Sequence, residues 1–527
     1  IGLVHVESHP GYAYQTLWDT AVRITFYFFI TGFVVLLLGG IGLRLLLKPL
    51  RRVERQAEAI CRKEWNIQKK IPKTKELRQV VQTMNKMTSR VKEMFEEQAA
   101  IAEKLRQSAF GDALTGLGNR RFITAQVKAV MVEDVDGVCK GAFQLIQVQN
   151  LQEVNTLRGY QGGDELLRQA SEVIEKAASN FAGKVTARLT GGDFAVFLPD
   201  IDTEDNERMA EEMAKGLARL SSRDLGVTDN ICGIGTVCYT APSSFEHLLA
   251  EADMALNSAL QAGPNKWHTI FSSADDETRK KGKVWWRKTL EHALSRKSFL
   301  LFGQQVAYSQ KPESALHLEL FSRILLEDGK AVPAGVFIPL AERSDLMSDL
   351  DRQVLTRLIA IYPLLGYQNV AINVSPSSLL DNTFVDWLTY KLKSVPADTL
   401  KIHFELPEFN AVQHLEEVRD FSRKVRELGH GIGLDHFGRS FSNFGYLKTL
   451  QPDYVKIDAA FTRELETEHG ESYFFIGALN SVAHSLDIKV IAEGVENEDQ
   501  FRMLTELHVD GIQGYFIDKP KQLEFQE

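Results

Sequence analysis

The sequence predicts a multidomain chain in which a transmembrane helix and a helical coiled coil precede an α+β domain and then an α/β barrel. Three observations predict this order: an apolar run near the start, a heptad repeat after it, and about eight short apolar strands at helix-length intervals in the last part of the chain. The 527 residues allow several domains. The net charge of −9 argues against nucleic acid as a partner, because phosphate backbones recruit basic faces.

Residues 24–43 form an uncharged, mostly apolar run of about the 20 residues that a helix needs to cross a membrane. The cationic excess follows this run, at Arg44, Lys48 and Arg51. The positive-inside rule therefore places the chain from Lys48 onward in the cytoplasm and residues 1–20 outside. A cleaved signal peptide is the alternative, but its charges would precede the apolar run. We expect one span at 21–47 and, before it, the end of an outer domain.

Two amphipathic helices joined by an extended connector follow the span. In the first, apolar residues have a 3-4-3 spacing: Leu50, Val53, Ala57 and Ile60. In the second, which opens near Lys75, apolar residues alternate at 3-4 spacing from Leu77 to Leu105, with Gln98 as the polar member. Such a seam requires a partner helix, so we expect a homodimer; packing on the chain's own domain is the alternative. Residues 48–98 resemble a HAMP signalling module, followed by a helical linker at 99–111.

Residues 112–272 resemble GGDEF (diguanylate cyclase) domains, on the motifs Asp112–Arg121 and Arg188–Phe194. The resemblance implies an α+β, nucleotidyl-cyclase-like fold. It also implies a degenerate site, because Gln147, Gln149 and Gly192 stand where the family has metal-binding carboxylates. Phosphoryl transfer needs divalent cations, and amides hold them poorly.

At other functional positions of this domain, some residues match those of the family and others differ. The family's phosphate-binding lysine and inhibitory RxxD motif are replaced, at Leu260 and at Phe181 and Lys184. Asn155 and Asp164 match the base-reading pair. They support either residual nucleotide binding or the fold alone.

The last part of the chain alternates strands with helices, which predicts a TIM-type α/β barrel. The predicted strands are residues 299–306, 316–323, 370–375, 401–406, 431–435, 454–458, 488–493 and 511–516. Polar residues recur at their carboxyl ends, where a barrel collects its functional groups on one rim.

Residues 280–527 resemble the EAL family of cyclic di-GMP phosphodiesterases, on the motifs Glu319–Arg323, Glu405–Glu408, Lys456–Asp458 and Gln513–Phe516. The resemblance implies that Glu319, Asn373, Glu405 and Asp435 hold a first divalent cation and that Lys456 orients the attacking water. A second cation needs a carboxylate directly after Asp435, and this chain has His436 there. Neutral imidazole binds magnesium or manganese weakly.

Three roles remain open for His436: packing or hydrogen bonding, ligand contact, and metal ligation. The following loop, residues 438–444, also departs from the family, and its Arg439 is a candidate phosphate contact. We therefore expect a degenerate domain with no catalytic residue and no required metal, which still binds cyclic di-GMP. The expected binding residues are Gln304, Glu319, Leu320, Arg323, Asn373, Glu405, Asp435, Lys456, Asp458, Glu493, Glu496, Gln513 and Phe516.

The order of these domains resembles LapD-type cyclic di-GMP receptors of the bacterial inner membrane. The resemblance implies that the linker helix and the GGDEF domain occlude the EAL site until ligand releases them and frees a dimerisation surface. An outer domain then sequesters a periplasmic cysteine protease, which controls adhesin retention and biofilm. A diguanylate cyclase is a further candidate partner.

Our first hypothesis is therefore a catalytically inactive cyclic di-GMP receptor. A weakly active phosphodiesterase is the alternative from the enzyme class. A protein-docking scaffold with vestigial pockets is the third.

Overall fold

The computed structural model describes residues 10–61, 65–72, 75–131, 140–220, 230–240, 243–272, 283–296, 299–326, 329, 331–342, 344–439, 444–465, 467 and 470–523. The chain divides after Glu96 into two compact units. Helix α2 (Lys75–Phe110) continues from the first unit into the second.

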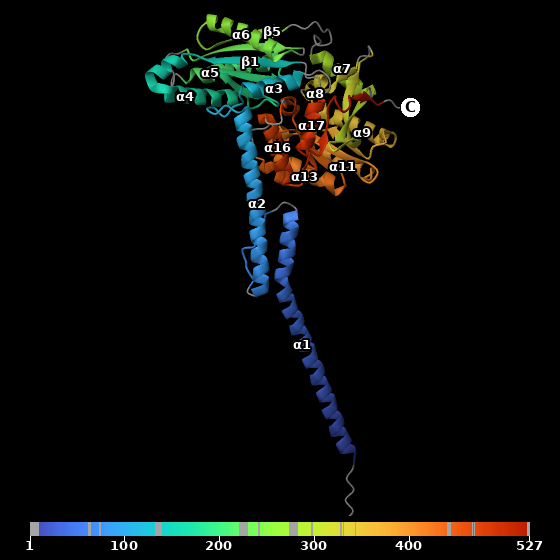
Figure 1. The fold of residues 1–527 in the computed structure, drawn as a ribbon. Helices are drawn as coiled ribbons and strands as arrows, with labels where there is room; N and C mark the ends of the chain where they lie inside the picture. Colours follow the sequence, from blue (N-terminus) through green and yellow to red (C-terminus); the bar gives the residue numbers. More distant parts are fainter. Residues whose placement is uncertain are drawn as a thin grey trace, which may run out of the picture. The chain divides into compact units, whose positions relative to one another are not determined.

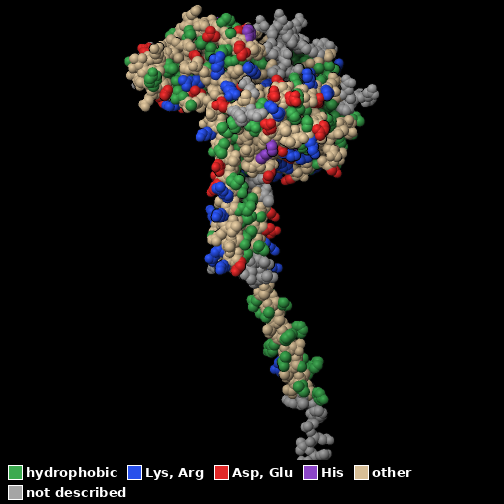
Figure 2. Space-filling view, viewed as in Figure 1, with side chains coloured by type: hydrophobic (Ala, Val, Ile, Leu, Met, Phe, Trp, Pro, Cys, Tyr) green, Lys and Arg blue, Asp and Glu red, His purple; other side chains and the backbone are tan. Residues whose placement is uncertain are grey.

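Helix α1 (Pro10–Cys61) contains the predicted span. Its segment Tyr14–Ile41 has a mean hydropathy of 2.3 and is long and apolar enough to cross a membrane. None of this segment is buried, and Figure 2 shows its apolar side chains exposed along the helix. The predicted span and the first amphipathic helix form one uninterrupted helix, whereas the second helix begins at Lys75 as expected.

A layer of amides joins α1, α2 and the connector between them. Gln56 is buried and donates to Asn85 Oδ1 at 3.0 Å and to Thr88 Oγ1 at 3.2 Å. Gln68 of the connector donates through Nε2 to Gln56 Oε1, and Asn85 Nδ2 donates to the Gln68 carbonyl, both at 3.0 Å. The apolar spacing of the first helix did not predict that Gln56 faces α2. Leu50, the first residue of that apolar set, is half exposed.

Helix α2 carries two apolar or small-residue stripes, each with a seven-residue spacing. One stripe is buried against the chain itself and consists of Val81, Thr88, Phe95, Ala102 and Ala109. The neighbouring stripe is exposed and consists of Val80, Met87, Met94 and Ile101. Since a regular heptad stripe is typical of a helix with a partner, the expected homodimer remains our prediction for this face.

The α+β domain in the middle of the chain matches the predicted fold (Figure 1). Its sheet has the order β2-β3-β1-β4-β5, in which β4 and β5 are parallel and the other neighbours are antiparallel. The strands are β1 (Gly141–Val148), β2 (Val185–Thr190), β3 (Asp193–Pro199), β4 (Cys232–Tyr239) and β5 (Lys266–Ser272). The helices are α3 (Arg120–Met131), α4 (Leu151–Ala178), α5 (Thr203–Ala218) and α6 (Phe245–Ala262).

The predicted eight-stranded barrel is confirmed, with one difference in strand direction. Strand β6 pairs with both β7 and β14 and closes the barrel, but it is antiparallel to both. The reason is the two-residue connection Ser309–Gln310, since a parallel pair would need a long crossover. The barrel strands are β6 (Phe299–Tyr308), β7 (Lys311–Leu325), β9 (Asn369–Asn373), β10 (Lys401–Pro407), β11 (Gly431–Phe437), β12 (Tyr454–Ile457), β13 (Lys489–Ala492) and β14 (Gly511–Ile512).

Helices cover the outside of the barrel, and two short strands extend its sheet. The helices are α7 (Lys283–Arg296), α8 (Ala334–Glu342), α9 (Met347–Leu365), α10 (Pro376–Leu380), α11 (Asn382–Leu392), α12 (Glu408–Gln413), α13 (Leu415–Glu427), α14 (Gly445–Leu450), α15 (Ala459–Arg463), α16 (Glu471–His484) and α17 (Glu498–Glu506). The additional strands are β8 (Ala331–Pro333) and β15 (Lys521–Gln522).

Within the second unit, the end of α2 and helix α3 contact the barrel at α15 and α16. Phe110, the last residue of α2, is fully buried, with its ring centroid 5.1 Å from that of Phe461 and 5.7 Å from that of Phe475. Beside it, Arg121 of α3 donates to Glu464 at 3.2 Å and to Glu471 at 3.1 Å. A buried aromatic cluster and a charged pair therefore join the two domains.

We expect the exposed stripe of α2 to form the dimer seam. A Met87→Cys variant should form a disulfide between two copies in oxidised membranes, because residues of a parallel seam face their own copies. Gln82→Cys, which lies on another exposed face of α2, is the matched control and should not cross-link. Electrophoresis without reductant, compared with the unmodified chain, measures the result; cross-linking of the control alone would contradict the assignment.

Candidate functional site

The carboxyl ends of the barrel strands surround one lysine. Lys456 on β12 has 1% of its side chain exposed, and its Nζ lies 2.8 Å from Glu319, 3.2 Å from Glu405 and 2.7 Å from Glu493. The three glutamates come from β7, from β10 and from the residue after β13. Because these strands are parallel, their carboxyl ends meet on the same rim, as the sequence predicted.

This cluster is electrostatically unusual because one ammonium faces several carboxylates. Burial lowers the pKa of Lys456, but Glu319, Glu405 and Glu493 outweigh it and raise that pKa well above its usual value. Burial and the charge of Glu319 raise the pKa of Glu405 well above its usual range. Burial and Asp435 raise the pKa of Glu493 to about 8. The lysine therefore stays charged, and Glu493 keeps a proton near neutral pH.

Amide side chains fix the orientation of Glu319. Gln513 Nε2 donates to Glu319 Oε2 at 2.7 Å and to Gln304 Oε1 at 3.0 Å. Asn373 Nδ2 donates to Glu319 Oε1 at 3.2 Å. Four of the predicted site residues thus form one hydrogen-bonded group.

Tyr454 is a site residue that the sequence reasoning missed. Its hydroxyl donates to Glu405 Oε1 at 2.6 Å. Buried His317 lies beneath the same carboxylate, with Nε2 3.9 Å from Oε1. The signal was available for Tyr454, because residues two apart on a strand face the same side and Tyr454 precedes Lys456 by two.

His436 lies at the rim beside the lysine cluster, in an unusual backbone conformation. Its φ is +57°, in the left-handed region, where the register of β11 against β12 shifts. The backbone N–H donates to Asp435 Oδ1 at 2.7 Å, and the ring lies with Nδ1 3.1 Å from Asp458 Oδ2. A non-glycine residue in this region is strained, and such strain is concentrated at functional sites.

The neighbours of His436 favour its charged form. Burial lowers the pKa of the imidazole, but Asp435, Asp458 and Glu493 outweigh it and raise that pKa to about 10. Burial raises the pKa of Asp458, but His436 and Arg439 outweigh it and lower the pKa to about 2. His436 is therefore an imidazolium paired with Asp435 and Asp458 at neutral pH.

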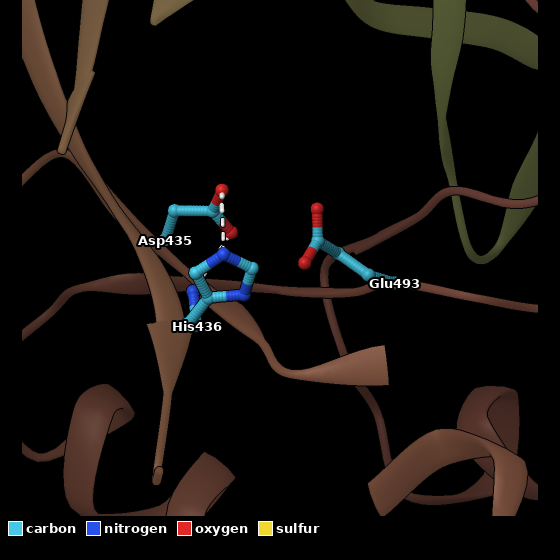
Figure 3. A group of neighbouring side chains, drawn as sticks. All are labelled: Asp435, His436 and Glu493. Atoms are coloured by element: carbon cyan, nitrogen blue, oxygen red, sulfur yellow. Dashed lines mark hydrogen bonds and ion pairs between the residues drawn. The ribbon is translucent and has the colours of Figure 1, made fainter. Parts of the chain in front are cut away.

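Three side chains at this rim have atoms close enough together for a metal ion. Among the described residues, Asp435, His436 and Glu493 each offer a ligand atom within 4.8 Å of the others (Figure 3). Figure 3 shows the Glu493 carboxylate facing the pair from the opposite side. Metal ligation needs a neutral imidazole, however, and the raised pKa of His436 opposes it.

The EAL resemblance gives Lys456 to hydrolytic members as well, so only His436 bears on a pair of metal ions. The ammonium of Lys456 lies between Glu319 and Glu405, two of the carboxylates that the EAL resemblance assigns to the first ion. His436 occupies the position after Asp435 where a second ion needs a carboxylate. The described side chains therefore lack the carboxylate after Asp435 that the EAL resemblance requires for a second ion.

Four predicted site residues join neither the cluster around Lys456 nor the group around His436. Arg323 lies over the Phe302 ring, with Cζ 4.1 Å from the centroid. Leu320 is buried in β7, and Phe516 is 43% exposed beside Phe501. The contacts of Arg323 and Phe516 are with aromatic rings outside the cluster.

Glu496, the fourth of these residues, pairs with a cation. Its Oε1 lies 2.8 Å from Arg463 Nε. Arg463 also donates to the Ala129 carbonyl of α3, at 3.3 Å. Glu496 therefore belongs to the contact between the two domains.

The middle domain has a cavity of about 710 Å³ where its resemblance places the nucleotide site. Amides line it: Gln147 donates to Asp193 Oδ1 at 3.0 Å, and Gln149 donates to Gln147 Oε1 at 2.6 Å. These hydrogen bonds engage one oxygen of Asp193 and the side-chain oxygen of Gln147.

Comparisons with known proteins agree with these two domains. The EAL domain family model matches residues 287–520, and the model of the diguanylate cyclase, GGDEF domain matches residues 109–266. The ligand-free S helix–GGDEF–EAL structure of Vibrio cholerae LapD has a TM-score of 0.69 and 26% identity, covering 81% of this chain and all of that chain.

Two curated relatives cover the same region. The cyclic di-GMP phosphodiesterase PdeB of Shewanella oneidensis is 26% identical over 439 residues, which are 81% of this chain and 50% of PdeB. The RNase E specificity factor CsrD of Escherichia coli is 26% identical over 434 residues, which are 81% of this chain and 66% of CsrD. The chain thus spans between half and two thirds of these relatives.

We expect Lys456→Met to destabilise the barrel by about 3–5 kcal/mol, because it leaves the buried carboxylates without their cation. Lys489→Met, at an exposed lysine on the neighbouring strand β13, is the matched control. Urea unfolding followed by tryptophan fluorescence measures both variants at pH 7. Equal stability of the two would show that the carboxylates do not depend on Lys456.

We expect the stability contributed by the His436 ion pairs to be complete below pH 6.5 and to be lost as pH rises towards 10. The folded protein holds the imidazole proton over this window and the unfolded chain releases it. His436→Asn, which tolerates the positive φ, should flatten the fall of the thermal midpoint between these pH values. An unchanged slope would contradict the ion pairs with Asp435 and Asp458.

Proposed function

The chain joins a GGDEF domain to an EAL domain in a LapD-like fold, and on this basis we propose that it is a membrane-anchored receptor that binds cyclic di-GMP without hydrolysing it. The dinucleotide binds at the rim around Lys456, in the EAL domain. Helix α1 anchors the chain in the bacterial inner membrane, with both domains in the cytoplasm. The identity of the ligand is inferred from the related proteins. The absence of hydrolysis is inferred from the residues at the rim.

The observation that carries the proposal is His436 in place of a carboxylate after Asp435, with its Nδ1 3.1 Å from Asp458 Oδ2. Hydrolysis in this family needs two divalent cations, and a fixed positive charge in place of a carboxylate repels the second one. Positive groups do not oppose binding, because the ligand carries two phosphates. Arg323 carries a guanidinium, a group that can bind two phosphate oxygens at once.

The contact between α2, α3 and the barrel supports a ligand-controlled switch. A ligand changes an equilibrium between two arrangements only if it binds one of them more tightly. We propose that the described arrangement, with Phe110 packed on Phe461 and Phe475, is the closed one. Its similarity to the ligand-free LapD structure supports this assignment.

We further propose that opening is transmitted through α2 and the HAMP module to an outer domain. As in the LapD resemblance, that domain would sequester a periplasmic cysteine protease and so control adhesin retention. A homodimer provides the partner for the exposed α2 stripe. A diguanylate cyclase in contact with the chain would supply ligand locally.

We expect the full chain in lipid nanodiscs to bind cyclic di-GMP at micromolar concentration and to leave it intact with magnesium or manganese. Arg323→Ala should weaken binding about tenfold, because a charge-assisted contact with phosphate is lost. Calorimetry measures binding, and chromatography of the nucleotide measures turnover. Absence of binding would contradict the proposal.

The cluster of Asp435, His436 and Glu493 favours one alternative, a weak phosphodiesterase that uses a single metal ion. Linear dinucleotide that forms with manganese and disappears in Lys456→Met would support that enzyme. In the scaffold alternative, Glu319 and Arg323 are vestigial, and their substitution would leave protease control unchanged.

A further inference from the structure

Arg439 connects the rim of the barrel to the GGDEF domain. Its guanidinium donates through Nη2 to the carbonyl of Gly183, at 3.1 Å. Gly183 lies between α4 and β2 with φ +69°, in a turn that presents this carbonyl. The contact joins two residues that are far apart in the sequence and belong to different domains.

The backbone of Arg439 is fixed next to the lysine and histidine cluster. Its N–H donates to the His436 carbonyl at 3.3 Å, through a turn at Gly438, whose φ is +89°. The guanidinium also interacts electrostatically with the carboxylates of the rim. Burial lowers the pKa of Arg439, and the charges of Asp458, Asp435 and Glu408 offset only part of this effect. Arg439 therefore lies beside the ligand rim while it holds the other domain.

A second arginine, Arg463, also contacts the GGDEF domain but differs from Arg439 in how its charge is paired. Arg463 also donates to a GGDEF carbonyl, that of Ala129, but its charge is paired with Glu496 at 2.8 Å. For Arg439, the contact across the domains is to a neutral carbonyl, and the structure gives it no carboxylate within ion-pair distance among the described residues. A ligand phosphate offers such a guanidinium a stronger, charge-assisted partner.

We propose that Arg439 is shared between two competing partners, the Gly183 carbonyl in the closed arrangement and a cyclic di-GMP phosphate in the open one. This inference rests on the proposed function and specifies how ligand opens the receptor. Binding replaces a hydrogen bond from the guanidinium to a neutral carbonyl of the GGDEF domain with an ion pair to the ligand. The exchange supplies the difference in affinity between the two arrangements that a ligand-driven switch requires.

The test compares Arg439 with Arg121, a closing residue away from the ligand rim. Arg121→Ala removes contacts with Glu464, Glu471 and Ser472 and should open the chain, so ligand should bind several-fold more tightly. In this opened background, adding Arg439→Ala should weaken binding about tenfold. Calorimetry on the full chain in nanodiscs measures all variants.

Arg439→Gln separates the two roles. Glutamine still donates a hydrogen bond to Gly183 but offers no charge to a phosphate. The glutamine variant should therefore stay closed without ligand yet bind ligand about tenfold more weakly in the Arg121→Ala background. Hydrogen exchange of α15 in the ligand-free chain reports opening and should be faster for Arg121→Ala and Arg439→Ala than for Arg439→Gln.

Three results would overturn the proposal or its premise. Equal affinity of Arg121→Ala and Arg121→Ala/Arg439→Ala would show that Arg439 does not contact the ligand. Unchanged hydrogen exchange of α15 in Arg439→Ala would show that the Gly183 contact does not hold the domains together. Absence of binding by both the unmodified chain and Arg121→Ala would instead refute the receptor function itself.

Discussion

The barrel rim depends on the compensation of buried carboxylates by Lys456. Glu319, Glu405 and Glu493 reach one ammonium at 2.7–3.2 Å, and the amides and Tyr454 fix the orientation of these carboxylates around it. Charges in such a setting are costly unless each has a partner. The rim therefore holds its acidic groups around a cation supplied by the chain itself.

The sequence predicted the architecture well because the spacing of apolar residues, which indicates helices and strands, can be read from one sequence. Strand ends at Glu319, Glu405 and Lys456 also predicted the convergence, since parallel strands share an edge. Other features depend on tertiary contacts that no local pattern records. The reversed direction of β6 follows from a two-residue connection, the charge of His436 follows from Asp458, and the pairing of Glu496 follows from a contact with another domain.

The contact between the GGDEF domain and the barrel combines interactions that differ in their sensitivity to salt. The aromatic cluster at Phe110 contributes apolar burial, which is insensitive to salt. The arginine contacts depend on charge and on geometry: Arg121 donates to carboxylates, whereas Arg439 and Arg463 donate to backbone carbonyls. The contact between the domains therefore combines one interaction that ionic strength leaves unchanged with several that it weakens.

The amide layer of Gln56, Gln68 and Asn85 limits how the segment that resembles a HAMP module can move. A small axial slide of α1 against α2 would separate donors from acceptors in the protein interior, where an unpaired amide is costly. Intermediate positions are therefore unstable, and only arrangements that restore the hydrogen bonds persist. The segment should consequently show two-state behaviour. A graded change in ligand concentration would then change the proportion of two discrete forms.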